Sequence, residues 1–139
     1  MTAPLYTRDI LRLAASIPHL EPIDAPDGEA ERRSVNCGSR VAVAVRLADG
    51  RVAELSQRVE ACAFGQAAAA LMGAAAVGRD AAGVRAGLAG IERWLSGDDG
   101  AVGAWPGLEV LEPARAKAGR HGAILLPFQA LLAAIGDKR

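Results

Sequence analysis

The sequence predicts an α+β domain in which helices pack on one face of an antiparallel sheet. From Arg40 to Leu47, large apolar residues alternate with residues that are polar or small, which is typical of a half-buried strand. The pair Asp49-Gly50 follows, and this dipeptide favours a tight hairpin into a second apolar stretch. From Cys62 onwards the apolar period becomes helical, and one helical segment precedes the strands.

Composition limits the classes of function. The chain has 139 residues, 51% of them hydrophobic, which suits one domain with a single core. Lysine plus arginine and aspartate plus glutamate both number 16, so charge gives no case for nucleic acid or for an anionic membrane. The N-terminus carries Arg8, Asp9 and Arg12, unlike a secretory signal, and no apolar run reaches the roughly 20 residues that span a bilayer. We therefore expect a cytoplasmic protein.

The N-terminal third contains one helix and one short strand. Pro4–Ser16 has apolar residues at helical spacing, and Thr7 is placed to support its first turn. The polar stretch Glu21–Glu31 is expected to be a loop or the approach to an edge strand. Arg32–Val35 is expected to be a short strand that leads into a tight turn at Asn36-Cys37-Gly38-Ser39.

The hairpin is the clearest β pattern in the chain. One face of its first strand holds Val41, Val43, Val45 and Leu47. The return strand is expected over Arg51–Glu60, with Val52, Leu55 and Val59 as its apolar members. Their spacing breaks strict alternation, which favours a β-bulge near Ala53.

Helices fill the rest of the chain. The helix after Cys62 is apolar nearly all round and is expected to end at Gly78, and Asp80 can cap the next one. That next helix carries a stripe of Val84, Leu88, Ile91 and Leu95. The glycines Gly83, Gly87 and Gly90 lie on the same helix, where small residues allow close packing.

The C-terminal region is expected to hold two helices joined by a connector. Trp105–Arg115 is expected to contain a short helix. Ala116–Gly122 is expected to be a basic, glycine-containing connector. The basic cluster of Arg115, Lys117 and Arg120 is expected to be solvated, and the alternative is that it contacts an acidic partner. The last helix is expected over Ala123–Ile135, with Pro127 in its first turn, where proline is tolerated.

Cys62 lies where a strand hands over to a helix, so the free N–H groups of that helix favour a thiolate. Cys37 lies on a glycine turn, and a chain without a secretion signal is expected to keep both thiols reduced. If the first and third strands run the same way, both cysteines lie at one end of the sheet. Two thiolates there suit a soft metal such as zinc or iron. The alternative, two small buried apolar residues, remains open.

Several short fragments are spread along nearly the whole chain: Asn36-Cys37-Gly38, Ala61-Cys62-Ala63, Gln66-Ala67, Leu71-Met72 and the tail from Arg120 to Leu131. In combination they resemble the NifU/IscU/SufU-type iron–sulfur cluster assembly scaffolds, and the SufU-like branch is the most similar. The resemblance implies a SufE/NifU-like fold, a three-stranded antiparallel sheet with helices on one face, as a single NifU N-terminal-like domain over residues 1–139. It also implies that sulfur is received from a cysteine desulfurase and that a [2Fe-2S] cluster is built or relayed. Some SufU-like members bind zinc instead.

The family site consists of three cysteines and one aspartate. By resemblance, the first two cysteines fall on Cys37 and Cys62, the aspartate position on Ser39 and the third cysteine position on Ala123. Two ligand positions are therefore degenerate. His121 is the candidate third ligand, and the alternative is that it is an exposed loop histidine.

Three hypotheses follow. In the first, the chain is a scaffold-like protein and not an enzyme; Cys37 and Cys62 bind metal or cluster, or accept sulfur, and a desulfurase and other assembly proteins are its partners. In the second, the same fold is a metal-free interaction or regulatory module that acts on a desulfurase. A third, a sulfurtransferase that uses one cysteine, lacks a recognisable general base.

Overall fold

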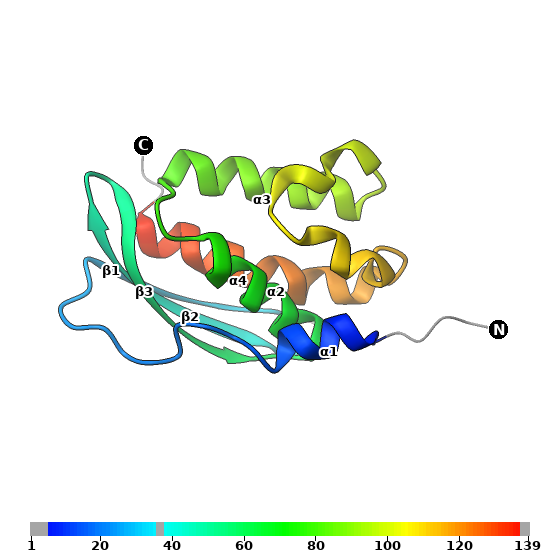
Figure 1. Ribbon diagram of the computed structural model, residues 1–139, viewed down its shortest axis with the longest axis horizontal. Coiled ribbons are helices and arrows are strands. Elements are labelled where there is room, and N and C mark those ends of the chain that lie inside the picture. The colour runs from blue at the N-terminus through cyan, green and yellow to red at the C-terminus, as the bar shows by residue number, and fades with distance from the viewer. Residues whose placement is uncertain (1–5, 36–37, 137–139) are drawn as a thin grey trace.

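The computed structural model describes residues 6–35 and 38–136 and confirms the α+β class. Three strands form one antiparallel sheet in the order β1-β2-β3, with the helices on one of its faces (Figure 1). The elements are, in order, α1 (Arg8–Ala14), β1 (Gly28–Arg33), β2 (Arg40–Ala48), β3 (Arg51–Glu60), α2 (Ala63–Ala75), α3 (Ala81–Leu95), the 3-10 helices η1 (Asp99–Ala104) and η2 (Leu108–Ala114), and α4 (Ala118–Ile135).

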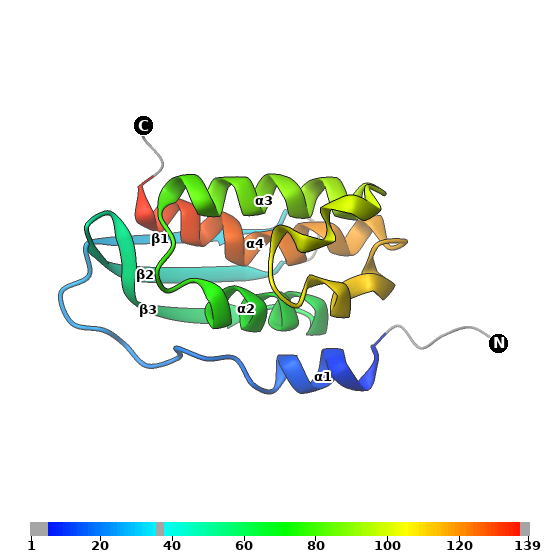
Figure 2. The ribbon, with the colours of Figure 1, turned by 45° about the horizontal axis from the view of Figure 1, so that its top comes forward.

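The helices form two layers over the inner face of the sheet. Helix α4 packs on β1 and β2, while α2 lies beside α4 and contacts β3. Helix α1 packs on α2, and α3 packs on α4 (Figures 1 and 2). The opposite, outer face of the sheet has no helix from the described residues packed on it. Figure 2 shows the segment after α1 running past β3 and turning at the hairpin end to enter β1.

The hairpin forms as predicted. Val41, Val43 and Val45 are buried on the inner face, and the residues between them are not. The turn has positive φ at both Asp49 (54°) and Gly50 (77°), as a two-residue hairpin turn of the primed type requires.

The bulge also lies where the spacing of apolar residues predicts it. Arg46 pairs with Glu54, whereas Leu47 pairs with Val52, so Ala53 is the extra residue in β3. The bulge resets the alternation, and both Val52 and Leu55 consequently face the core.

The first strand begins earlier than predicted: it spans Gly28–Arg33, not Arg32–Val35. Its polar composition carries little strand propensity, and pairing with β2 imposes the extended conformation. Gly28 is required at its start, because a Cβ there would overlap the main-chain carbonyl of Ala134 in α4. The strand is therefore specified by tertiary contacts that the sequence pattern does not reveal.

Two predicted helix caps are confirmed. The Thr7 hydroxyl accepts a hydrogen bond from the Ile10 N–H (3.2 Å) at the start of α1. The Asp80 carboxylate accepts one from the Gly83 N–H (2.8 Å) at the start of α3. Such caps satisfy N–H groups that have no partner inside the helix.

Close packing explains the glycines of α3. A Cβ on Gly87 would lie 2.9 Å from the Trp105 ring, and one on Gly90 would overlap the Ala104 side chain. These two glycines let η1 approach the helix closely, as predicted for small residues on this face. Trp105 is fully buried there and donates from Nε1 to the Leu71 carbonyl (2.7 Å).

The last helix is longer than predicted. Helix α4 begins at Ala118, so the connector predicted over Ala116–Gly122 is largely helical and Pro127 lies in the helix interior. Proline has no N–H to donate to the Ala123 carbonyl, and the helix continues because it is held between the sheet and the other helices. By length and composition alone α4 could also cross a membrane; in this fold it is the central core helix.

Candidate functional site

The strands bring both cysteine-bearing connections to one end of the sheet. Because β1 and β3 both run antiparallel to β2, Arg33 and Glu60 lie on either side of Arg40. We call this end of the sheet the cysteine end. Within the β1–β2 connection the Ser34 N–H donates to the Ser39 carbonyl (2.8 Å). Cys37 belongs to that connection but lies outside the described residues, so its approach to Cys62 stays a prediction.

Cys62 is the N-cap residue of α2. Its backbone is extended (φ −67°, ψ 173°), its carbonyl accepts a bond from the Gln66 N–H (2.9 Å), and its side chain makes no capping hydrogen bond. The thiol is free and half-buried, and the first turn of α2 contains no acidic residue. This is the helix terminus at which unpaired N–H groups stabilise negative charge.

An aromatic contact lies at the first turn of α2, which directly follows Cys62. The rings of Tyr6 and Phe64 pack with their centroids 5.0 Å apart and their planes at 60°. Phe64 is fully buried, so the first turn of α2 is fixed on its core side. A rigid helix start keeps the Cys62 position well defined.

The two degenerate ligand positions are both buried. Ser39 is 3% exposed, directly before β2, and Ala123 is fully buried in the second turn of α4. A Cβ built on Gly65 would lie 3.4 Å from the Ala123 Cβ, which places Ala123 against the first turn of α2. The position that the resemblance assigns to the third cysteine therefore lies against the helical turn that begins at Cys62.

His121 does not lie in an exposed loop. It is half-buried in the first turns of α4, and its Nε2 lies 3.0 Å from the carbonyl oxygens of both Ala114 and Arg115. Two carbonyl partners require Nε2 to carry the proton and donate. The ring thus satisfies the last carbonyls of η2, and only Nδ1 is left as a nitrogen lone pair in the neutral form.

The described side chains do not complete a metal site. Within residues 6–35 and 38–136, no group of three or more histidine, cysteine, aspartate or glutamate side chains could hold a metal ion. Structural zinc takes four protein ligands. Cys62 together with Cys37 would supply two thiols, so further ligands would have to come from outside this set.

The surface of the cysteine end is rich in arginine. Arg40 and Glu60 form an ion pair of 2.8 Å, and this hydrogen bond is the main cause that lowers the pKa of Glu60 and raises the pKa of Arg40. Arg58 and Arg33 lower the pKa of Glu60 further through their charges. Three guanidinium groups therefore surround one exposed carboxylate.

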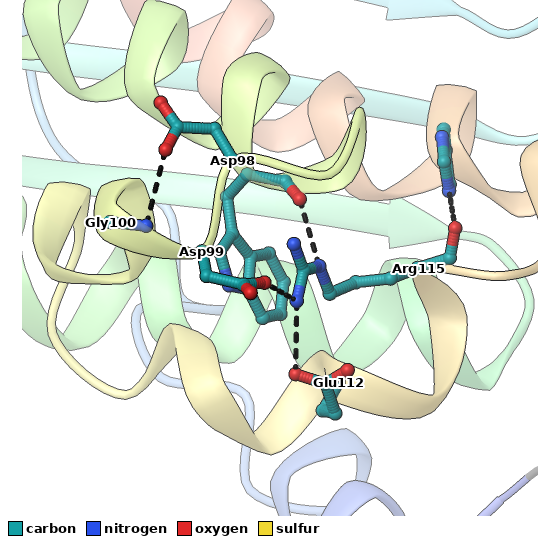
Figure 3. A network of polar contacts seen from close by, with 7 residues as sticks. Asp98, Asp99, Gly100, Glu112 and Arg115 are labelled. Carbon is teal, nitrogen blue, oxygen red and sulfur yellow. Dashed lines mark hydrogen bonds and ion pairs between the residues drawn. The ribbon is translucent and has the colours of Figure 1, made fainter.

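A second polar cluster lies around the two 3-10 helices and has a structural role (Figure 3). We call residues 99–121, from η1 to the first turn of α4, the 3-10 segment. Arg115 is 15% exposed and pairs with Asp99 (2.7 Å) and Glu112 (3.4 Å), and its guanidinium lies 4.8 Å from the centre of the Trp94 ring. Its Nε also donates to the Trp94 carbonyl (2.8 Å), and the Asp99 contact is the main cause of its raised pKa. The prediction that Arg115 is solvated is wrong, because its side chain is largely buried against Trp94 and pairs with Asp99, and both of these residues are distant from it in sequence.

Sequence reasoning also missed a buried glutamine. Gln57 occupies the inner face of β3 at 1% exposure, and its Nε2 donates to the carbonyls of Pro18 (3.1 Å) and Ala69 (3.2 Å). It ties the segment after α1 to α2 across the end of the core. The strand pattern does place residue 57 on the apolar face between Leu55 and Val59, which is the signal that could have revealed it.

Solved structures with the same fold include a NifU-like protein and a protein described as an iron–sulfur cluster assembly scaffold. A NifU-like protein (N-terminal) from Brucella abortus is 29% identical, with 97% of this chain and 96% of that chain covered and a TM-score of 0.83. A scaffold protein described for the SUF system, from Fervidobacterium islandicum AW-1, is 17% identical with a TM-score of 0.80; 94% of this chain and 96% of that chain are covered. No family model and no curated protein matches the sequence.

Together the sheet, the helix order and these likenesses define a NifU-type fold. The second likeness, at its low identity, supports the fold alone. The likeness to the NifU-like protein confirms the resemblance to the NifU/IscU/SufU-type scaffolds that the motifs of this chain indicate.

Proposed function

We propose that the chain takes part in iron–sulfur cluster assembly as a scaffold-like protein, and that Cys37 and Cys62 accept sulfur or hold a cluster as cargo. The observation that carries this proposal is the placement of Cys62 at the start of α2 with a free, half-buried thiol and no capping bond. The strand directions that bring the connection containing residue 37 to the same end support it. Residues 1–139 would act as one NifU N-terminal-like domain, in the cytoplasm and without turnover of a substrate.

Sulfur acceptance needs only one reactive thiolate. The Cys62 thiolate attacks the terminal sulfur of a desulfurase persulfide, and the sulfur–sulfur bond of the donor breaks as a new one forms on Cys62. The donor cysteine leaves as a thiolate, so the exchange needs no external oxidant or reductant. A cysteine desulfurase is the partner that supplies such a persulfide, and other assembly proteins would receive the sulfur or the cluster.

Metal or cluster binding would be transient and shared. Two thiols leave a [2Fe-2S] cluster or a zinc ion short of ligands. His121 could supply one through Nδ1, or through Nε2 after releasing the carbonyls of Ala114 and Arg115. A partner protein, a small thiol or a second subunit would supply the rest.

One observation favours the alternative, a metal-free module that regulates a desulfurase. Ser39 and Ala123 are integrated into the packed core, which is expected of positions that no longer face a metal. In that case the fold binds its partner while the thiols do no chemistry.

Anaerobic expression with metal and sulfide analysis separates these functions. Iron, zinc and acid-labile sulfide are measured in the wild type, in Cys37→Ser, in Cys62→Ser and in the double variant, which is the control. Persulfide is measured by intact mass after mixing with a desulfurase and cysteine. We expect an added sulfur on Cys62 in the wild type and none in the double variant. Desulfurase binding without metal, sulfide or persulfide would establish the regulatory module instead.

A further inference from the structure

The balanced total charge of the chain conceals a polarised sheet. The strand register divides the charged residues of the sheet at Val43, near the middle of β2. The half with the cysteine end holds Arg32, Arg33, Arg40 and Arg58 against Glu31 and Glu60. The half with the hairpin holds Arg46 and Arg51 against Asp27, Glu29, Asp49 and Glu54. The two halves therefore carry opposite excess charge.

Three of the four arginines stand on the outer face, which no helix of the described residues covers, whereas Arg32 pairs with the inward-facing Val41. Arg33, Arg40 and Glu60 form one row across the three strands, and Arg58 lies in the next outward-facing row, opposite Ala42. The side chains of Arg33 and Arg40 are 67% and 41% exposed. Arg40 pairs with Glu60 (2.8 Å), Arg33 pairs with Glu31 (3.8 Å), and Arg58 acts on Glu60 through its charge. Three guanidinium groups thus face two carboxylates and retain capacity for a further one.

An exposed apolar residue lies at the same end. Val35 is 98% exposed in the connection that leaves β1 after Arg33. An exposed apolar side chain two residues from Arg33 matches the general anatomy of a protein interface, in which apolar and polar side chains lie next to each other. Arginine is also among the residues enriched at such interfaces.

We propose that the cysteine end is a docking surface for an acidic protein surface, that of the partner which delivers sulfur to this site. Arg33, Arg40 and Arg58 attract carboxylates of the partner, Val35 packs against it, and the acidic hairpin end repels it. The approaching partner is thereby oriented with its donor group towards Cys62. This inference rests on the proposed function and adds to it the charge of the partner.

Two matched charge reversals test the proposal. Arg40→Glu and Arg46→Glu both change an exposed arginine on the outer face of β2, and each breaks one ion pair, with Glu60 or with Glu54. Their side chains are similarly exposed, at 41% and 45%. The probe is a purified cysteine desulfurase, whose association rate is measured at low salt and at about 1 M salt, where the Debye length falls to roughly 3 Å.

We expect Arg40→Glu to slow association about tenfold at low salt, because steering by charge acts mainly on the association rate. Arg46→Glu should leave the rate within about twofold, and high salt should remove the difference between the variants. Equal effects of the two reversals, no salt dependence, or no binding by the wild type would overturn the proposal. So would tighter binding of an RNA oligonucleotide than of a glutamate-rich peptide.

The binding measurement is repeated with the Cys37→Ser/Cys62→Ser double variant, which separates docking from sulfur chemistry. Retained, salt-sensitive binding supports the docking surface even if the wild type accepts no sulfur, in which case the proposed function alone fails. If persulfide is transferred and Arg40→Glu does not change the rate of transfer, the docking surface is refuted while the proposed function stands.

Discussion

The cysteine end and the 3-10 segment differ in how their polar groups are used. In the 3-10 segment the Arg115 guanidinium has carboxylate, carbonyl and aromatic partners, and His121 donates to two carbonyls. At the cysteine end, Cys62 makes no capping bond and the three outward-facing arginines have two carboxylates among them, Glu31 and Glu60. Fully partnered groups hold a structure together, whereas groups with spare capacity are available to a ligand or partner. This difference separates structural residues from candidate functional ones in a chain where both regions contain arginine.

The largest expected effect is a loss of stability when a buried residue next to the 3-10 helices is removed. Trp105→Ala removes a fully buried ring that packs edge-on against Phe128 (4.9 Å) and lies 4.0 Å from the Arg79 guanidinium. Emptying such a site costs about 3–5 kcal/mol of unfolding free energy. Urea denaturation measures it, and Trp105→Phe is the control, which loses mainly the bond to the Leu71 carbonyl, worth about 1 kcal/mol. Equal losses in the two variants would show that the hydrogen bond, not the packing, holds the segment.

Restoring the degenerate ligands is expected to sharpen the comparison at the cysteine end. The double variant Ser39→Asp/Ala123→Cys should bind one zinc ion that the wild type binds weakly or not at all, because Ala123 packs against Gly65 in the helical turn that begins at Cys62. Zinc at 100 times its dissociation constant would then stabilise the variant by about 2.7 kcal/mol. Zinc content and the zinc-dependent rise in melting temperature measure this effect.

The corresponding control is Ala123→Ser, which adds similar volume at the α2–α4 contact without a thiolate. Its stability separates overpacking, which costs about 1–3 kcal/mol, from metal binding. Zinc-independent stability of the double variant would mean that position 123 is not the third ligand position.

His121 lies at the boundary between the two regions and tests the division between them. His121→Ala leaves the carbonyls of Ala114 and Arg115 without their donor, which should cost about 1–3 kcal/mol in urea denaturation. Persulfide formation on Cys62 should be unchanged. Unaltered stability together with lost metal binding would instead assign His121 to the metal site.

The sequence predicts the fold well because its strongest signals are local. Asp49-Gly50 sets the hairpin, the spacing of Val52 and Leu55 sets the bulge, and Thr7 and Asp80 set helix starts. Each signal acts within a few residues of where it is read. The family motifs, which lie around both cysteines, then define the arrangement of these parts.

Tertiary contacts explain what the sequence did not predict. Strand β1 is extended because β2 pairs with it, and α4 extends back to Ala118 where His121 contacts η2. Arg115 meets Asp99 and Trp94 only after folding. The uneven distribution of charge over the sheet likewise follows from the strand register, since no single strand shows which charges are neighbours.

The smallest expected effect concerns the pH dependence of the ion pair between Arg40 and Glu60. The folded-state pKa of Glu60 is lowered, chiefly by its hydrogen bond to Arg40, so the stabilisation from this pair is present above the ordinary glutamate pKa. It is lost as the pH falls through the lowered pKa. Carboxyl chemical shifts measured against pH should show Glu60 titrating below the ordinary glutamate range, and Arg40→Gln should move it back towards that range. Because Arg40 and Glu60 are 41% and 67% exposed, salt should weaken the shift. A Glu60 titration that Arg40→Gln does not move, or a shift that salt leaves unchanged, would contradict the pairing of these two exposed side chains.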